Sequence, residues 1–330
     1  MTLDFRALGV AVGHATDTAG ATGLTVIRGV DAPMRAGAAV FGRASGTREL
    51  HTLSADHLVD RIDAVLLTGG SAYGLDAASG VMQWMEERSR GFLVPGGVVP
   101  IVPAAVIFDL VPLGRFDARP TAAMAYDACD AATPNDVAEG SVGAGTGATV
   151  GKIAGPTRAM KGGVGGAIVE NGAWHVGALA VVNALGDVRD ASGRIIAGAR
   201  ADERRSAPYS FVDTVRQLAS SASSLAGDRL GAAAATNTTL SVVITDAPLG
   251  KVELGQLARA AGAALFRRIT PTGTTVDGDV VFALAPATAP KPLGSAATAI
   301  EALAVAALER AIERAVITAR GRDGVPGLAD

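Results

Sequence analysis

The sequence predicts an α/β fold in which helices and strands form layers. Short β-rich runs alternate with longer helical patterns along the whole chain. Hydrophobic residues make up 49% of the 330 residues and charged residues 18%, a globular composition with enough apolar side chains for a large core. Aromatic residues are scarce at 4%, so the core is expected to consist mainly of Ala, Val, Leu and Ile. We find no internal repeat and no linker between two separate cores, which favours a single large domain.

Four strands are predicted from short apolar or β-branched runs that are bounded by turn residues. The first is followed by Thr68 and a double glycine, which turn the chain. The predicted strands are Ala64–Leu67, Ala178–Val182, Thr239–Thr245 and Asp279–Ala285.

Four helices are predicted from apolar residues at helical spacing. Ser71 is the candidate N-cap of the first helix, whose apolar stripe is Leu75, Ala78, Met82 and Met85. The other predicted helices are Thr121–Ala132, Val252–Arg268 and Ser295–Ala319.

Composition and spacing argue against several classes of partner. The net charge is −3 without a block of either sign, so we expect neither nucleic acid nor an anionic membrane as a partner. The single cysteine, Cys129, is expected to be an ordinary buried thiol, and the four scattered histidines predict no metal site. The glycine-rich run Gly143–Ala148 lacks the strand and acid of a dinucleotide site, so no cofactor is expected. No signal peptide or membrane-spanning stretch is visible, which predicts a cytoplasmic protein.

A hydroxyl residue stands at the start of the third predicted strand. Thr238 follows Asn237 and a run of small residues, Ser220–Thr236, that reads as a flexible loop. Taken alone, Asn-Thr is simply a turn that enters a sheet, because both residues are common in turns.

Four segments, in order along the chain, favour a different interpretation of the Asn237–Thr238 junction. They are Gly9–Asp17 with Thr22–Ile27, Leu66–Leu75, Val142–Lys152 with Lys161–Gly165, and Asn237–Leu240 with Asp277–Asp279. Together they resemble the autoprocessing aminopeptidases with an N-terminal nucleophile. That family includes L-aminopeptidase/D-amidase-esterases, β-peptidyl aminopeptidases and nylon-oligomer endo-hydrolases.

The resemblance is closest to the nylon-oligomer hydrolase branch, which uses a Thr nucleophile after Asn, where Thr238 stands here. The peptidase branches commonly carry Ser as the nucleophile, and a Ser-x-Glu pair in place of the two Asp residues. The run that begins at Lys161 looks more like the aminopeptidase branch, so the substrate stays open. The branch's other catalytic residues match Lys152, Asn183, Asp277 and Asp279.

The resemblance implies a four-layer α-β-β-α sandwich. It implies one domain over residues 1–330 that cleaves itself between Asn237 and Thr238 into fragments 1–237 and 238–330. It also implies a homo-oligomer, a tetramer of cleaved units, that hydrolyses small amides, short peptides or oligoamides without a cofactor. Tyr73 matches a residue that lines the substrate pocket in the family.

The residue types suit this chemistry. A Thr hydroxyl is a weak nucleophile that needs an adjacent base, and a free α-amine with a pKa of about 7.7 serves at neutral pH. Lys152 would stabilise negative charge, and the Asn183 amide would donate to the oxyanion. Asp277 and Asp279 share a face in an extended segment and would orient Thr238 and Lys152.

Each assignment has a structural alternative. Lys152 would otherwise be a solvated surface lysine, Asn183 a turn residue, and Asp277 with Asp279 only a turn. Tyr73 is equally well explained as a packed aromatic residue. Two other functions also stay open at this point. One is acyl transfer to an amine, as in the ornithine acetyltransferases, and the other is metabolite binding by an unprocessed protein.

Overall fold

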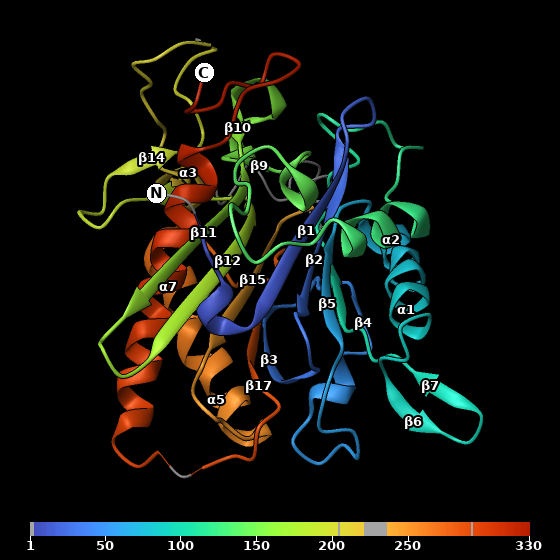
Figure 1. Cartoon of the computed structure of the whole chain (residues 1–330). Coiled ribbons are helices and arrows are strands. Elements are labelled where there is room, and N and C mark those ends of the chain that lie inside the picture. The colour runs from blue at the N-terminus through green and yellow to red at the C-terminus, as the bar shows by residue number, and fades with distance from the viewer. Residues whose placement is uncertain (1–2, 204, 221–235, 292) are drawn as a thin grey trace.

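Two five-stranded sheets lie face to face between two layers of helices (Figure 1). The structure is a computed structural model that describes residues 3–203, 205–220, 236–291 and 293–330. The first sheet has the order β1-β2-β5-β8-β4 and the second the order β11-β12-β15-β17-β3. The four-layer α-β-β-α prediction is therefore confirmed.

The first sheet contains β1 (Val10–Asp17), β2 (Thr22–Gly29), β5 (Ala64–Thr68), β8 (Ala104–Val106) and β4 (Thr47–Arg48). The second contains β11 (Gly163–Glu170), β12 (His175–Asn183), β15 (Thr238–Thr245), β17 (Gly278–Pro286) and β3 (Met34–Gly42). Smaller strands are β6 (Phe92–Val94), β7 (Gly97–Val99), β9 (Thr149–Val150), β10 (Met160–Lys161), β13 (Asp187–Arg189), β14 (Ile195–Ala197) and β16 (Ile269–Thr270).

The α-helices are α1 (Ala78–Glu86), α2 (Ala122–Asp130), α3 (Thr214–Ser220), α5 (Lys251–Ala261), α6 (Ala263–Arg268) and α7 (Ala296–Ile317). Short 3-10 helices are η1 (Arg6–Leu8), η2 (Leu50–Leu53), η3 (Ser71–Ala77), η4 (Gly143–Gly145), η5 (Lys152–Ala154) and η6 (Pro156–Arg158).

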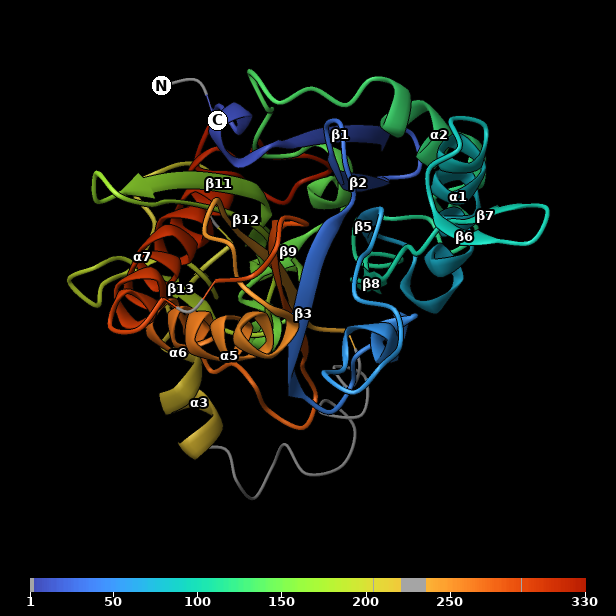
Figure 2. The ribbon, with the colours of Figure 1, turned by 60° about the horizontal axis from the view of Figure 1, so that its bottom comes forward.

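Three apolar cores hold the layers together. Between the sheets, side chains such as Leu240 and Phe282 pack against Val12 and Leu67 of the other sheet. Helices α5, α6 and α7 cover the outer face of the second sheet, and α1 and α2 cover the first (Figure 2). The apolar residues of each strand alternate between the inner and outer cores, because successive side chains point to opposite faces.

The strand register brings three chain positions to one end of the second sheet. Asn183, the last residue of β12, is the antiparallel partner of Thr238, the first residue of β15. Strand β17 runs parallel to β15 and begins at Gly278, with Leu240 opposite Val280. The end of β12 and the starts of β15 and β17 therefore meet beside the Asn237–Thr238 bond.

All four predicted strands are present, each within a few residues of the predicted bounds. The predicted N-cap at Ser71 is wrong: Ser71 has a left-handed φ of 52° and makes no capping bond, and a 3-10 helix precedes α1. The predicted helix Val252–Arg268 is divided at Gly262, where the Phe41 ring occupies the space of a Cβ atom. The predicted loop Ser220–Thr236 lies almost entirely outside the described residues.

The predicted helices Thr121–Ala132 and Ser295–Ala319 are confirmed as α2 and α7, with slightly shorter bounds. Cys129 is fully buried in α2, as expected, and burial raises the pKa of its thiol to about 12. Among the described residues, no helix combines the length and the apolar character needed to cross a membrane.

Candidate active site

Thr238 is buried at the start of β15, with 4% of its surface exposed. Its Oγ1 donates a hydrogen bond of 2.6 Å to the carbonyl oxygen of Asn237, the residue before it. The same carbonyl oxygen accepts a second bond of 2.9 Å from the backbone N–H of Gly278. The hydroxyl group therefore lies against the peptide group of the Asn237–Thr238 bond, and a backbone donor already polarises that carbonyl.

Lys152 approaches this junction from a tight turn. Gly151 has a φ of +69°, and a Cβ atom there would lie 2.0 Å from the backbone of Gly198, so only glycine fits. The Lys152 Nζ donates to Asn183 O at 3.0 Å, to Asn183 Oδ1 at 2.9 Å and to Thr236 O at 3.0 Å. Lys152 is thus not a solvated surface lysine.

Burial lowers the pKa of Lys152 to about 7, and the charges of Asp277, Asp109 and Asp279 oppose the decrease. Three acceptors surround Nζ, and only the ammonium form supplies a proton to each of them. Near pH 7 the side chain is therefore partly protonated, and a lower pH favours the cation next to the junction.

Asn183 uses both ends of its amide. Its Oδ1 accepts from Thr149 N at 3.0 Å and from Lys152 Nζ, while its Nδ2 donates to Phe108 O at 3.0 Å and to Thr236 O at 3.2 Å. Asn183 is 1% exposed and ends a strand, so it is not a turn residue. Lys152 and Asn183 together bind the carbonyl of Thr236, two residues before Thr238.

Asp277 and Asp279 flank the start of β17, and each is 2% exposed. Asp279 Oδ1 accepts from Thr239 N at 2.6 Å, and its Oδ2 accepts from Thr272 Oγ1 at 2.7 Å. Asp277 Oδ2 accepts from the N–H and the hydroxyl of Thr274 at 2.9 and 2.6 Å. Burial raises the pKa of Asp279 to about 7, and the charge of Asp277 adds to this increase.

The Asp contacts differ in detail from the expectation. Asp279 holds the backbone beside Thr238, and neither carboxylate has a hydrogen bond to the Lys152 ammonium within the described part of the chain. Both act on Lys152 through their charge. The structure thus brings Thr238, Lys152, Asn183, Asp277 and Asp279 to one end of the second sheet.

Tyr73 is not part of this cluster of candidate residues. It belongs to η3, and 52% of its surface is exposed, so it is not a packed core aromatic. Just before it, Ser71 N donates to Ile107 O at 3.0 Å. Phe108, the next residue, supplies the carbonyl that Asn183 binds. Residues 107–109 therefore separate Tyr73 from the catalytic candidates.

Asp109 is a buried acid that the sequence reasoning did not identify. Its carboxylate accepts from Thr22 Oγ1 and from Gly70 N, each at 2.7 Å. Burial raises the pKa of Asp109 to about 6. Asp109 follows Phe108 directly in the chain. The Phe108 carbonyl binds Asn183 and the Asp109 carboxylate binds Gly70, so these two neighbours connect Asn183 to the turn that carries Tyr73. The only sequence signal is an acid directly after an apolar run.

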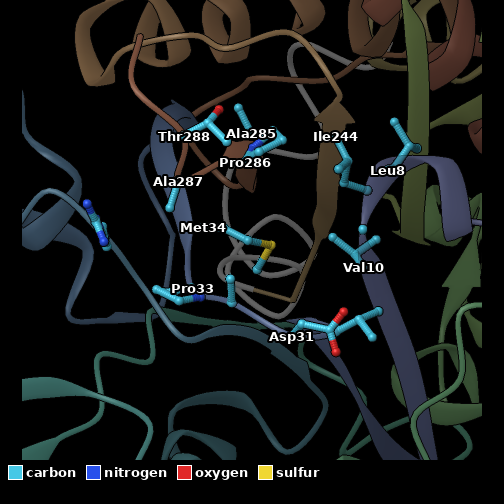
Figure 3. A pocket seen from close by; sticks show the side chains of 14 residues that line it. Leu8, Val10, Asp31, Pro33, Met34, Ile244, Ala285, Pro286, Ala287 and Thr288 are labelled. Atoms are coloured by element: carbon cyan, nitrogen blue, oxygen red, sulfur yellow. The ribbon is translucent and has the colours of Figure 1, made fainter.

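A cavity of about 420 Å³ opens at the opposite end of the sheets (Figure 3). Its lining includes Val10, Met34, Ile244 and Ala285, and none of the candidate catalytic residues. Because Ile244 and Ala285 lie near the ends of β15 and β17, while Thr238 and Asp279 lie at their starts, this cavity is separate from the candidate site. The described residues also contain no group of three or more His, Cys, Asp or Glu side chains that would hold a metal ion.

Comparisons with known proteins identify the family of the chain. The model of Peptidase family S58 matches residues 7–329. An uncharacterized aminopeptidase of Mycobacterium leprae is 43% identical over 308 residues, covering 86% of this chain and 80% of the relative. A 6-aminohexanoate-oligomer endohydrolase of Kocuria sp. is 31% identical over 291 residues, covering 86% and 74%.

Two solved structures share the fold. The beta-aminopeptidase of Burkholderia sp. superposes with a TM-score of 0.71 at 23% identity, covering 97% of this chain and 88% of that one. The L-aminopeptidase D-Ala-esterase/amidase of Ochrobactrum anthropi, described as a variant of the Ntn hydrolase fold, gives 0.68 at 22% identity, covering 96% and 86%.

The layered fold, the buried Thr site and these relatives define a hydrolase of amide or peptide bonds with the N-terminal-nucleophile fold. The chain belongs to Peptidase family S58.

Proposed function

We propose that the chain cleaves itself between Asn237 and Thr238, and that Thr238 then serves as the N-terminal nucleophile of an amide hydrolase. The observation that carries this proposal is the contact of Thr238 Oγ1 with the Asn237 carbonyl at 2.6 Å. The products are fragments 1–237 and 238–330 of one domain. The sheet that contains β15 and β12 would keep the fragments together after cleavage.

Self-cleavage begins with attack of Thr238 Oγ on the Asn237 carbonyl carbon. The negative charge that develops on the carbonyl oxygen is stabilised by the Gly278 N–H, which already donates to it. The C–N bond then breaks, the Thr238 nitrogen takes up the proton that its hydroxyl gives up, and Asn237 is left as an ester on Thr238 Oγ. One water molecule hydrolyses the ester and leaves a carboxylate on Asn237 and a free α-amine on Thr238.

Cleavage also changes what Lys152 and Asn183 bind. In the intact chain both donate to the Thr236 carbonyl. Departure of the new C-terminus frees an ammonium and an amide donor beside the nucleophile. They then stabilise the oxyanion that forms when Thr238 attacks a substrate carbonyl.

In the cleaved protein the α-amine of Thr238 is the general base, because its reference pKa of about 7.7 suits neutral pH. Asp279 fixes the backbone of Thr239, and Asp277 balances the charge of Lys152. The substrates are aminoacyl amides, short peptides or oligoamides, which fits relatives named as aminopeptidases and as an oligomer endohydrolase.

We also propose a homo-oligomer, a tetramer of cleaved units, in the cytoplasm. The oligomer is supported by the hairpin β6–β7, which exposes 81% of Leu93 and 44% of Phe92. Exposed apolar side chains in one patch commonly mark an interface between proteins. Light scattering of the purified protein measures the mass, and a monomer would exclude this part of the proposal.

The decisive experiment follows the fragments on a denaturing gel. The wild-type protein should yield two bands, and N-terminal sequencing of the smaller one should begin Thr-Thr-Leu-Ser. Thr238→Ala should remain intact and inactive. Ser241→Ala is the matched control, since it removes a buried hydroxyl on the same strand that has no hydrogen-bond partner. A folded wild-type protein that stays in one piece would refute self-cleavage.

A further inference from the structure

An arginine is stacked on the exposed side of Tyr73. The guanidinium carbon of Arg119 lies 3.4 Å from the centroid of the Tyr73 ring and 5.9 Å from that of Phe116. Both rings are more than half exposed, at 52% and 60%. Arginine that stacks on an aromatic face keeps its N–H donors in the plane of the guanidinium group, where a ligand can reach them.

The charge of Arg119 is not balanced by any ion pair or hydrogen bond within the described residues. Its buried Nε atom has no partner. The neighbouring charges do not compensate for it, because Arg115 and Asp117 pair with each other at 3.4 Å. An unpaired guanidinium with a fixed orientation is suited to bind a carboxylate through two parallel bonds.

A chain of contacts connects the segment of Arg119 to the candidate active site. A Cβ atom on Gly70 would lie 2.9 Å from Pro120, so the segment of Arg119 packs on the turn that leads to Tyr73. That turn is bound to residues 107–109, where the Phe108 carbonyl contacts Asn183. Residues 107–109 thus connect the turn that Arg119's segment packs on to Asn183, the proposed oxyanion donor.

We propose that Arg119, held by Tyr73, binds the terminal carboxylate of the substrate. The inference rests on the proposed function and narrows its substrate class. It selects short peptides or oligoamides with a free carboxylate over the corresponding amides and esters. The aminoacyl end of such a substrate acylates Thr238, and the part that leaves carries the carboxylate.

The test compares alanine di-, tri- and tetrapeptides as free acids and as C-terminal amides. The wild-type protein should prefer the acid by about 10-fold in kcat/KM at the length that fits best, the expected effect of a charge-assisted contact at a partly exposed site. The preference should decrease as NaCl is raised from 0.05 to 0.5 M, because salt screens an exposed charge. Calorimetry with N-acetyl-trialanine and its amide measures the same preference without turnover.

Three variants test whether Arg119 causes the preference for the free acid over the amide. In Arg119→Gln the acid-to-amide ratio should fall to about 1, and in Arg119→Lys it should be intermediate, because an ammonium lacks the planar pair of donors. Arg115→Gln, which loses a charge nearby, should keep the wild-type ratio. All three should still cleave themselves, and Arg115→Gln should hydrolyse alanine p-nitroanilide, which has no carboxylate, as the wild type does.

Two outcomes would overturn the assignment: a wild-type ratio of 1 in both assays, or an unchanged ratio in Arg119→Gln. Failure of the proposed function looks different, because then neither the wild type nor any variant forms fragments or hydrolyses the anilide. In that case the calorimetric ratio alone decides whether Arg119 binds carboxylate.

Discussion

Replacing Lys152 with Met tests the group on which the site most depends. Met keeps the unbranched apolar stem of the side chain but lacks the terminal ammonium group. The Thr236 carbonyl then loses one of its two side-chain donors, and the junction loses its nearby cation. Removal of one electrostatic group of this kind commonly costs about 10²–10³ in rate, so we expect self-cleavage and turnover to decrease by that factor.

The same substitution has a predicted signature in stability. Burial lowers the pKa of Lys152 from 10.5 to about 7, so between these values the unfolded chain holds a proton that the folded chain has released. Folding stability therefore rises with pH in this interval, by up to about 1.4 kcal/mol per pH unit. Below pH 7 the folded protein contains the desolvated cation and is least stable relative to the variant.

Chemical denaturation from pH 6 to 10 measures this effect. Both proteins carry Thr238→Ala, so that each unfolds as one intact chain. Lys161 is also buried, and burial lowers its pKa to about 7, but it is present in both proteins and cancels in the difference. The stability advantage of Lys152→Met should shrink steadily above pH 7. A difference that is constant with pH, or one that the surface variant Lys291→Met reproduces, would refute the reasoning.

Three other perturbations follow from the same contacts. Asp109→Asn should lower the free energy of unfolding by roughly 1–3 kcal/mol in urea denaturation, because an amide has one oxygen and cannot accept from both Thr22 and Gly70. It should also raise KM, and an unchanged KM would show that Asp109 does not position the turn that carries Tyr73. In the Thr238→Ala background, folding stability should decrease as the pH rises from 4 to 7, because the folded Asp279 carboxyl keeps its proton to about pH 7 while the unfolded one releases it near 3.8. Asp279→Asn should abolish this decrease, and an unchanged pH profile in the variant would contradict the prediction. The rising limb of kcat/KM in the neutral range should survive replacement of each of the four histidines, whose contacts lie elsewhere, as His14 with Thr25 and His175 with Asp246 illustrate; loss of the limb in one variant would make that histidine the base.

The sequence predicts the strands well, and with them the place of Thr238 at the start of one, for a physical reason. The run Thr239–Thr245 is rich in β-branched residues, and every residue of β15 is buried, because the strand lies between two other strands and both of its faces are covered. Once such a strand is recognised in the sequence, the hydroxyl residue at its start is identified as well. The predicted bounds differ from the structure by only one residue at this end.

Residue type alone was a poor guide where backbone geometry decides. Ser71 has the side chain of an N-cap, but an N-cap needs an extended backbone and Ser71 has a φ of 52°. At Gly262, where the predicted helix is divided, the Phe41 ring leaves no room for a Cβ atom, and Phe41 is more than 200 positions earlier in the sequence. Asp109 and Arg119 were missed for the same reason, since their roles come from contacts with Gly70 and Tyr73 that no local pattern contains.

The contacts of Thr236 connect self-cleavage to substrate access. A substrate carbonyl needs free donors next to Thr238, yet in the intact chain the Lys152 ammonium and the Asn183 amide both bind the Thr236 carbonyl. Under the proposed mechanism, the uncleaved protein therefore lacks two things that catalysis requires: the α-amine that acts as the base, and unoccupied donors for the oxyanion. Breaking one peptide bond supplies both, because the bond that releases the Thr238 nitrogen also releases the segment that ends at Asn237. On this reasoning the order of events is set by the occupancy of the oxyanion donors as well as by the chemistry of the nucleophile.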